Sequence, residues 1–161
     1  MSDTVVRTKR GSWRIVGEKL VAPNDLWDEL IAEARKVQEN AYAPYSKFRV
    51  GAAALVDGTI YKGCNVENAS YGGTICAERS AIFSAVAAGA RDLEMIAITT
   101  DAKDKEPIES RSPCGFCRQV MSEFAGPETL VLLDNGSSEE ADFTGEVIFF
   151  DDLLPWRFRL S

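Results

Sequence analysis

Residues 72–100, "GGTICAERSAIFSAVAAGARDLEMIAITT", predict a helix followed by a strand. The alanine-rich run after Cys76 favours a helix, and Gly89 is a suitable residue to end it. The segment from Leu93 to Thr100 is mostly apolar and lacks polar alternation, which is typical of a strand covered on both faces. Such a helix-strand pair indicates a domain in which helices cover a sheet.

The segments on either side of this stretch continue the alternation of helices and strands. A helix is predicted from its N-cap, Asn24, because the apolar residues after it recur at helical spacing: Trp27, Leu30, Ile31, Ala34 and Val37. An Asp57-Gly58 turn joins two predicted strands. A further helix is expected between Pro113 and Gly126, and two more strands are expected at 129–134 and 145–150.

The resulting element order is α-β-β-α-β-α-β-β. It predicts an α/β fold, a three-layer α/β/α sandwich around a mixed five-stranded sheet. We expect residues 24–161 to form a single domain, because 161 residues of which 45% are hydrophobic suffice for one core. Residues 1–23 form an N-terminal extension of unknown role, and residues 12–22 either add an edge strand or wrap around a neighbouring molecule.

The charge and hydropathy of the chain argue against several classes of function. Lys and Arg total 18 against 25 Asp and Glu, so the net charge is −7 and the domain should repel a phosphate backbone. No apolar run approaches the roughly 18 residues that a membrane-spanning helix needs. The N-terminus also lacks the apolar core of a signal peptide. We therefore expect a cytoplasmic protein whose partners include neither nucleic acid nor a membrane.

Three of the four cysteines are spaced as ligands of one metal ion. In a reducing compartment, cysteines are more often metal ligands or buried thiols than disulfides. Cys114 and Cys117 form a C-x-x-C pair in the first turn of a helix, and Cys76 can supply a third thiolate. Three thiolates favour zinc and leave one tetrahedral position open, as in a catalytic site, unless Cys64 or a carboxylate closes it. Otherwise we interpret Cys64 as a buried free thiol.

Glu78 and Arg79 follow the first of these cysteines. Residues two apart on a helix project about 200° from each other, so Glu78 should not bind the ion held by Cys76. It can instead take a proton from a water in the open position and pass it on, as a proton shuttle. Three thiolates and one Zn²⁺ leave a net charge of −1, which we expect Arg79 to offset electrostatically. Taken alone, the C-x-x-C pair would also suit a redox pair or half of a structural zinc site.

Five motifs carry a family resemblance: "YAPYSKFRVGAA", "GCNVENASYG", "CAERSAI", "SPCGFCRQV" and "DLLP". Through them, residues 24–158 resemble the small, homotetrameric, zinc-dependent cytidine deaminases. The resemblance implies one Zn²⁺ per chain, with Cys76, Cys114 and Cys117 as its ligands and Glu78 as the catalytic proton shuttle. It also implies hydrolytic deamination of free cytidine or deoxycytidine to uridine or deoxyuridine plus ammonia, in pyrimidine salvage.

The resemblance further implies which residues contact the nucleoside. Asn65 and Glu67 would hold the ribose hydroxyls, although an amide and a carboxylate at this point also suit a strand-end cap. Phe48 would pack on the pyrimidine ring, unless it is a core aromatic, and Ala77 would face the edge of the base. Neighbouring subunits of a homotetramer would complete the site with aromatic side chains: Tyr71, Phe158 and, less directly, Tyr45.

Gly72 and Gly73 depart from the family pattern, in which bulkier residues are frequent at these positions. Glycine removes side-chain volume, so we hypothesise that this loop borders the exocyclic amine and lets the enzyme accept N4-substituted cytidines.

Three other functions remain open: deamination of aminonucleoside antibiotics of the blasticidin type, deamination of single-stranded nucleic acid, and a non-enzymatic zinc module. The "NVEN" motif argues against the first and the negative charge against the second. The third predicts a fourth protein ligand and no role for Glu78.

Overall fold

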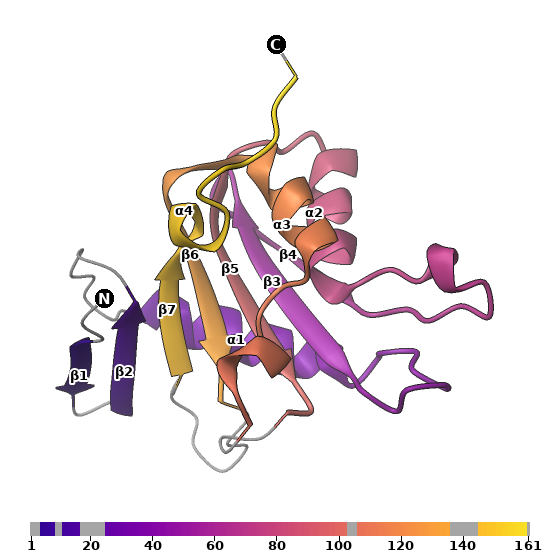
Figure 1. The fold of residues 1–161 in the computed structure, drawn as a ribbon, viewed down its shortest axis with the longest axis horizontal. Coiled ribbons are helices and arrows are strands. Elements are labelled where there is room, and N and C mark those ends of the chain that lie inside the picture. The colour runs from indigo at the N-terminus through magenta and orange to yellow at the C-terminus, as the bar shows by residue number, and fades with distance from the viewer. Residues whose placement is uncertain (1–3, 9–10, 17–24, 103–105, 136–144, 161) are drawn as a thin grey trace.

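Seven strands form one mixed sheet in the computed structural model, which describes residues 4–8, 11–16, 25–102, 106–135 and 145–160 (Figure 1). The strands are β1 (Thr4–Thr8), β2 (Gly11–Val16), β3 (Val50–Val56), β4 (Thr59–Cys64), β5 (Leu93–Thr100), β6 (Ala125–Asp134) and β7 (Gly145–Phe149). Their order in the sheet is β1-β2-β7-β6-β5-β3-β4.

The predicted five-stranded mixed sheet corresponds to β3–β7. Strands β3 and β4 form an antiparallel hairpin around Asp57 and Gly58, β5 is antiparallel to β3 and parallel to β6, and β7 is antiparallel to β6. The hairpin of β1 and β2 extends this sheet, because β2 pairs in parallel with β7. Residues 12–16 thus add a strand to the sheet, as in the first of the two alternatives, but this strand lies between β1 and β7, and β1 is the edge strand. The predicted N-cap Asn24, residues 17–23 and the turn at Gly136 lie outside the described residues.

Helices cover both faces of the sheet and confirm the three-layer sandwich (Figure 1). They are α1 (Asp25–Gln38), α2 (Ala77–Ala87), α3 (Gly115–Ser122) and α4 (Phe150–Leu153), with short 3₁₀ turns η1 (Tyr71–Gly73) and η2 (Ile108–Ser110). Successive residues of β3 point to opposite faces. Ala53 packs in the same buried cluster as Trp27 of α1, whereas Ala54 packs in the cluster that holds Ala81 of α2.

Two boundaries differ from the sequence prediction. Helix α3 ends at Ser122 instead of reaching Gly126, and β6 begins at Ala125. The reason is tertiary, because Ala125 pairs with Leu93 of β5 and the Leu93 N–H donates to the Phe124 carbonyl. The short helix α4 replaces the end of the last predicted strand, since Phe150 turns into the core.

Two glycines set how closely the helices approach the sheet. A Cβ atom on Gly51 would lie 2.1 Å from the carbonyl oxygen of Ala34 in α1, and one on Gly63 would lie 2.3 Å from the backbone nitrogen of Ala81 in α2. Both distances are far below any van der Waals contact, so only glycine fits. Among the described residues, no helix has both the length and the apolar character needed to span a membrane.

Candidate metal centre and substrate pocket

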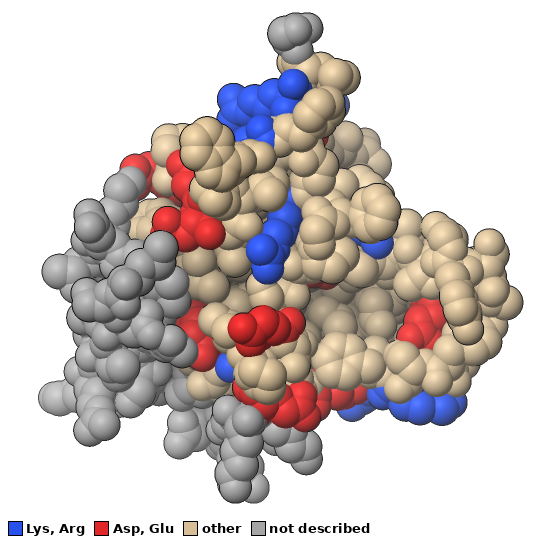
Figure 2. All heavy atoms as spheres, in the orientation of Figure 1, with Lys and Arg blue, Asp and Glu red and all other residues tan. Residues whose placement is uncertain are grey.

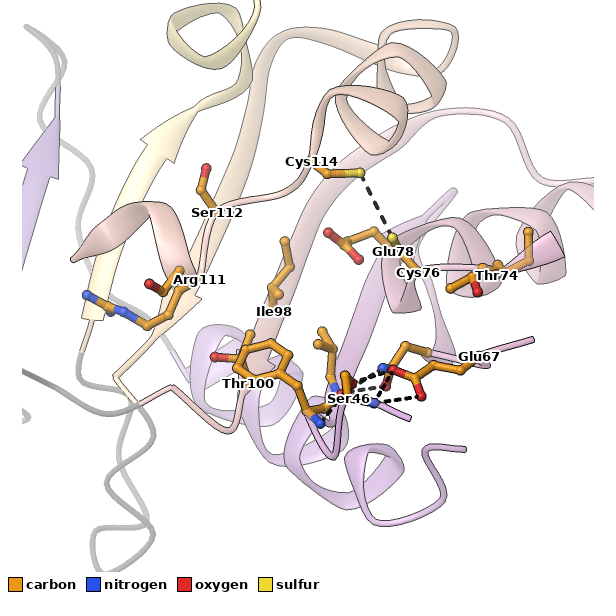
Figure 3. A pocket seen from close by; sticks show the side chains of 15 residues that line it. Ser46, Glu67, Thr74, Cys76, Glu78, Ile98, Thr100, Arg111, Ser112 and Cys114 are labelled. Atoms are coloured by element: carbon orange, nitrogen blue, oxygen red, sulfur yellow. Dashed lines mark hydrogen bonds between the residues drawn. The ribbon is translucent and has the colours of Figure 1, made fainter. Parts of the chain in front are cut away.

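Three cysteine sulfurs converge at the N-terminal ends of α2 and α3. Figure 3 shows two of them, those of Cys76 and Cys114. Cys76 is the N-cap of α2, Cys114 is the N-cap of α3, and Cys117 lies in the first turn of α3. The Sγ atoms of Cys76 and Cys114 are 3.9 Å apart, and those of Cys114 and Cys117 are 3.6 Å apart. Zn–S bonds of about 2.3 Å in a tetrahedral site separate two sulfurs by about 3.8 Å. The cysteines therefore have the spacing of zinc ligands.

Cys64 stands apart from this centre. Within the part of the chain that the structure describes, the metal-binding group contains only the three sulfurs, which lie within 4.8 Å of one another. Among the described residues, neither Cys64 nor a carboxylate joins this group as a fourth ligand, which agrees with an open site. Burial raises the pKa of the Cys64 thiol, so this residue is a neutral, partly buried thiol at the end of β4.

The electrostatic surroundings of the sulfurs suit thiolate ligands. Neither N-cap cysteine caps its helix with a side-chain hydrogen bond, so both sulfurs are free to point at an ion. The Arg79 Nη2 atom lies 3.4 Å from the Cys76 sulfur. The hydrogen bond from the Cys117 thiol, together with Arg79, lowers the pKa of Cys76 to about 5. Arg79 Nε is buried and has no hydrogen-bond partner among the described residues, so its positive charge remains available to the sulfur cluster.

Glu78 is buried beside the metal centre without belonging to it. Its side chain is 4% exposed and lies in the first turn of α2, as expected from its separation from Cys76 along the helix. Figure 3 shows its carboxyl group in the pocket next to Cys76 and Cys114. Burial raises the pKa of Glu78 to about 7. A carboxyl group with such a pKa can both accept and donate a proton near neutral pH.

A cavity of about 290 Å³ opens onto these residues. It runs from the sulfur cluster past the ends of β3 and β5 to the loop that contains Ser46. The residues that line it are Ser46, Phe48, Val50, Asn65, Glu67, Thr74, Ile75, Cys76, Glu78, Ile98, Thr100, Ser110, Arg111, Ser112 and Cys114. The pocket therefore brings together six residues predicted from the sequence: Phe48, Asn65, Glu67, Cys76, Glu78 and Cys114.

Asn65 organises the backbone around Phe48. Its Oδ1 atom accepts a hydrogen bond of 2.8 Å from the Val50 N–H, and its Nδ2 atom donates one of 2.9 Å to the Phe48 carbonyl. These bonds are those of the strand-end alternative considered for Asn65. An amide has two donors and two acceptor lone pairs, so one of each remains for a ligand and the sugar contact stays a prediction.

Glu67 holds the turn at Tyr45 and Ser46. Its carboxylate accepts from the Tyr45 N–H at 2.8 Å and from the Ser46 N–H and hydroxyl (Figure 3). The hydrogen bond from Ser46 holds the pKa of Glu67 below its ordinary value. Glu67 is therefore a carboxylate at neutral pH that lines the pocket while it supports the adjoining turn.

Four residues that the resemblance assigned to the substrate do not line the cavity of the single chain: Ala77, Tyr45, Tyr71 and Phe158. Ala77 is fully buried in α2, whereas Tyr71 is 85% and Phe158 66% exposed. Gly72 and Gly73 are not lining residues either, although Thr74, directly after them, is one. Their predicted roles remain predictions.

The far wall of the pocket was missed by sequence reasoning. It consists of Ser110, Arg111 and Ser112 before the C-x-x-C pair, with Thr100 at the end of β5. Arg111 is 4% exposed and pairs with Glu146 of β7 at 2.7 Å. The motif that contains Ser112 was a possible signal for this segment, but the Arg111 pair joins residues far apart in sequence and has no local signal.

The described surface shown in Figure 2 is mostly uncharged, with acidic groups more prominent than basic ones around its lower part. On this face the described residues form no continuous basic groove of the kind that tracks a nucleic acid backbone. This agrees with the net charge of −7.

Comparison with known proteins identifies the family of this chain. The model of the cytidine and deoxycytidylate deaminase zinc-binding region matches residues 26–133. A cytidine deaminase of Sporosarcina psychrophila is 51% identical over 116 residues, which are 70% of this chain and 82% of the relative. A cytidine deaminase of Halalkalibacterium halodurans is 46% identical over 130 residues, 80% of this chain and 91% of the relative.

Solved structures give the same result. The crystal structure of cytidine deaminase from Burkholderia pseudomallei matches with a TM-score of 0.68 and 47% identity, over 81% of this chain and 97% of that one. That from Mycobacterium tuberculosis matches with a TM-score of 0.67 and 38% identity, over 86% and 100%. The fold and the three-sulfur centre thus define a zinc-binding deaminase domain. This chain belongs to the cytidine and deoxycytidylate deaminase family, and the predicted zinc-dependent, hydrolytic type of enzyme is confirmed.

Proposed function

We propose that the protein deaminates free cytidine and deoxycytidine by hydrolysis, giving uridine or deoxyuridine and ammonia in pyrimidine salvage. The observation that carries this proposal is the buried Glu78 carboxyl beside three sulfurs in one pocket. A non-enzymatic zinc module would have no use for a buried acid with a pKa raised to about 7 at this point.

The chemistry divides between the ion and Glu78. Zinc bound by Cys76, Cys114 and Cys117 would supply the Lewis acidity that activates a water molecule for attack at C4 of the base. Glu78 takes the proton released by that water and delivers it to N3 of the ring. The same carboxyl then takes the remaining proton from the new hydroxyl on C4 and passes it to the exocyclic nitrogen, so that the C4–N bond breaks, ammonia leaves and the C4 oxygen becomes the carbonyl of the product.

The other end of the pocket would recognise the nucleoside. Asn65 keeps one donor and one lone pair, and Glu67 is a carboxylate, so both can bind the sugar hydroxyls. Phe48 lines the same cavity as these residues and the metal centre, so its ring can pack on the pyrimidine. We assign Ala77 to the edge of the base through its position between Cys76 and Glu78.

We also propose a homotetramer whose sites are completed by neighbouring subunits, and a cytoplasmic location in which the three thiols stay reduced. The exposed aromatic residues Tyr45, Tyr71 and Phe158 support the assembly, because large exposed apolar groups gather at protein interfaces. In this proposal residues 24–161 are the catalytic domain, and the protein takes neither nucleic acid nor a membrane as partner.

The proposal is tested by following the ultraviolet absorbance of cytidine with zinc-loaded wild-type protein and with the Glu78→Gln variant. The wild type should turn over cytidine. The kcat of the variant should be lower by about 100-fold to 10,000-fold, which is the rate enhancement that a general acid-base group typically contributes. Both should bind about one zinc per chain, because Glu78 is not a ligand. A wild type that binds zinc without turnover would mean that the substrate is wrong, and antibiotic aminonucleosides would be tested next.

The N4-substituted cytidines form a narrower proposal. Gly72 and Gly73 precede Thr74 in the pocket wall, and a Cβ atom on Gly72 would meet nothing within 4 Å, so this loop has space beside it. N4-methylcytidine should therefore be turned over, and Gly72→Phe should reduce its kcat/KM more than that of cytidine. Failure of the wild type to accept N4-methylcytidine or N4-acylcytidine, with cytidine a good substrate, would rule the idea out.

A further inference from the structure

Arg118 of α3 holds three separate groups with its guanidinium. Nε donates to the Pro113 carbonyl at 2.8 Å, Nη2 donates to the Ser112 hydroxyl at 2.8 Å, and Nη1 donates to the Leu153 carbonyl at 3.0 Å. The three acceptors belong to the turn before α3 and to the end of α4. Arg118 therefore ties the first turn of α3 to two other segments of the chain.

One of these bonds acts on a metal ligand. The Pro113 carbonyl belongs to the peptide group that joins Pro113 to Cys114, the N-cap of α3. Cys114 is the exposed member of the sulfur cluster and makes no side-chain cap bond, so its backbone largely determines where its sulfur lies. A guanidinium that fixes this peptide group also fixes the direction of the Cys114 side chain.

The second bond acts on the pocket wall. Ser112 lines the cavity on the turn that leads to Cys114 (Figure 3). Its hydroxyl accepts a hydrogen bond from Arg118 of α3. Arg111, in the same turn, is anchored separately to Glu146 of β7. The turn that carries Ser112 and Cys114 is thus held from β7 on one side and from α3 on the other.

The partners of Arg118 differ in kind from those of Arg79. Arg79 approaches the Cys76 sulfur at 3.4 Å, where its charge counts. The three hydrogen bonds of Arg118 described above all go to neutral oxygens, for which the direction of the N–H donor matters more than the charge of the guanidinium. A guanidinium has five donors in a rigid plane, whereas an ammonium is a compact point charge.

We propose that Arg118 is a positioning residue of the metal centre, which places the Cys114 sulfur by holding the Ser112–Cys114 turn against α3 and α4. This inference rests on the metal-binding part of the proposed function and does not depend on which nucleoside is the substrate. It assigns the two arginines beside the ligands to different tasks, charge for Arg79 and geometry for Arg118.

The test is Arg118→Lys, which keeps the charge and loses the planar donor set. Zinc affinity is measured by competition with a chromophoric chelator, and the apo-protein is titrated with cadmium while the thiolate charge-transfer absorption is recorded. Loss of a group that orients a ligand typically weakens metal binding by about 10-fold to 100-fold. We expect a loss of that size, a changed cadmium spectrum, and at saturating zinc a lower kcat with KM for cytidine nearly unchanged.

Arg91→Lys is the matched control. Arg91 also donates to backbone carbonyls, those of Val86 and Ala90 at the end of α2, but it lies away from the sulfurs. Its variant should bind zinc and cadmium as the wild type does. Zinc affinity of Arg118→Lys within twofold of the control, with the same cadmium spectrum, would overturn the proposal.

A second variant decides the matter if Arg118→Lys does not fold. Ser112→Ala removes one acceptor of the guanidinium and leaves the bond to Pro113. Its zinc affinity should fall by about 2-fold to 10-fold, the worth of one hydrogen bond. An unchanged affinity would count against the proposal. Because metal binding is measured without any nucleoside, this result stays separate from a failure to deaminate cytidine.

Discussion

The Ser46 hydroxyl joins two residues that would contact different parts of a nucleoside. It donates to the Glu67 carboxylate and accepts a hydrogen bond of 3.0 Å from the Phe48 N–H. Asn65 holds the Phe48 carbonyl from the other side. Both backbone polar groups of Phe48 are therefore held by residues that line the pocket, so the ring is placed before any substrate binds.

This arrangement predicts the effect of Ser46→Ala. Loss of the hydroxyl should raise KM for cytidine by about 10-fold, because its hydrogen bonds with Glu67 and Phe48, which orient these binding residues, are lost while both partners remain. The kcat should change less, since Ser46 does not touch the metal centre. Ser46→Thr, which keeps the hydroxyl, should restore KM, and Ser84→Ala on the exposed face of α2 should match the wild type. A fall in kcat with an unchanged KM would contradict this role.

At the scale of elements, the two helices that carry the sulfurs begin without a polar cap. N-caps are usually Ser, Thr, Asp or Asn, and their replacement costs about 1 kcal/mol. Cys76 and Cys114 occupy these positions and make no side-chain cap bond. The start of each helix thus directs a cysteine sulfur toward the metal centre. The partial positive charge at each helix N-terminus favours the thiolate form of these cysteines.

The approach of α2 to the sheet predicts a cost for Gly63→Ala. The added Cβ would meet the backbone of Ala81 and Ala77, at 2.3 and 2.6 Å, and no flexible side-chain end can move aside. The free energy of unfolding of the zinc-loaded variant should fall by about 1–3 kcal/mol. Its kcat should also fall, because α2 carries Glu78. Urea unfolding monitored by circular dichroism measures the loss.

Gly126→Ala is the control for this prediction. A Cβ atom at Gly126 would have nothing within 4 Å. Its stability should stay within about 0.5 kcal/mol of the wild type, as for most surface substitutions. Equal stability of the two alanine variants would show that α2 shifts at no cost and would refute the argument.

At the scale of the whole molecule, the aromatic residues are divided between the core and the outside. Trp27 and Phe150 are buried, whereas Tyr71, Trp156 and Phe158 are 85%, 95% and 66% exposed. Phe158 lies on the C-terminal segment, whose backbone is held by Gln119 of α3. An enzyme whose neighbour supplies such residues would have sites that span two chains.

The proposed assembly predicts complementation between two inactive variants. In a homotetramer co-expressed from Glu78→Gln and Phe158→Ala chains, a site with its own Glu78 and a neighbour's Phe158 is intact. Random mixing should then restore about a quarter of the wild-type activity. Glu78→Gln with Cys117→Ser should restore none, because both lesions affect residues of the chain's own site. Absence of recovery in a verified hybrid tetramer would mean that Phe158 does not complete a neighbour's site.

Much of the site was predictable because its central residues are neighbours in sequence. Cys76, Glu78 and the Cys114–Cys117 pair stand at helix starts, where spacing along the chain determines direction, and the structure brings them together as expected. The exclusion of Cys64 was not decided in advance. It depends on where β4 ends relative to α2 and α3, which is a property of the assembled sheet.

The sequence by itself determined the order of elements from α1 to β7, the three sulfurs and the acid beside them, since these follow from periodicity and spacing over a few residues. Only the tertiary structure decided which residues surround them. Ser46 meets Glu67, Arg111 meets Glu146 and Arg118 meets Leu153 across long stretches of chain. Local patterns carry no information about such pairs, because the order of strands in the sheet and the close approach of helices at Gly51 and Gly63 bring them into contact.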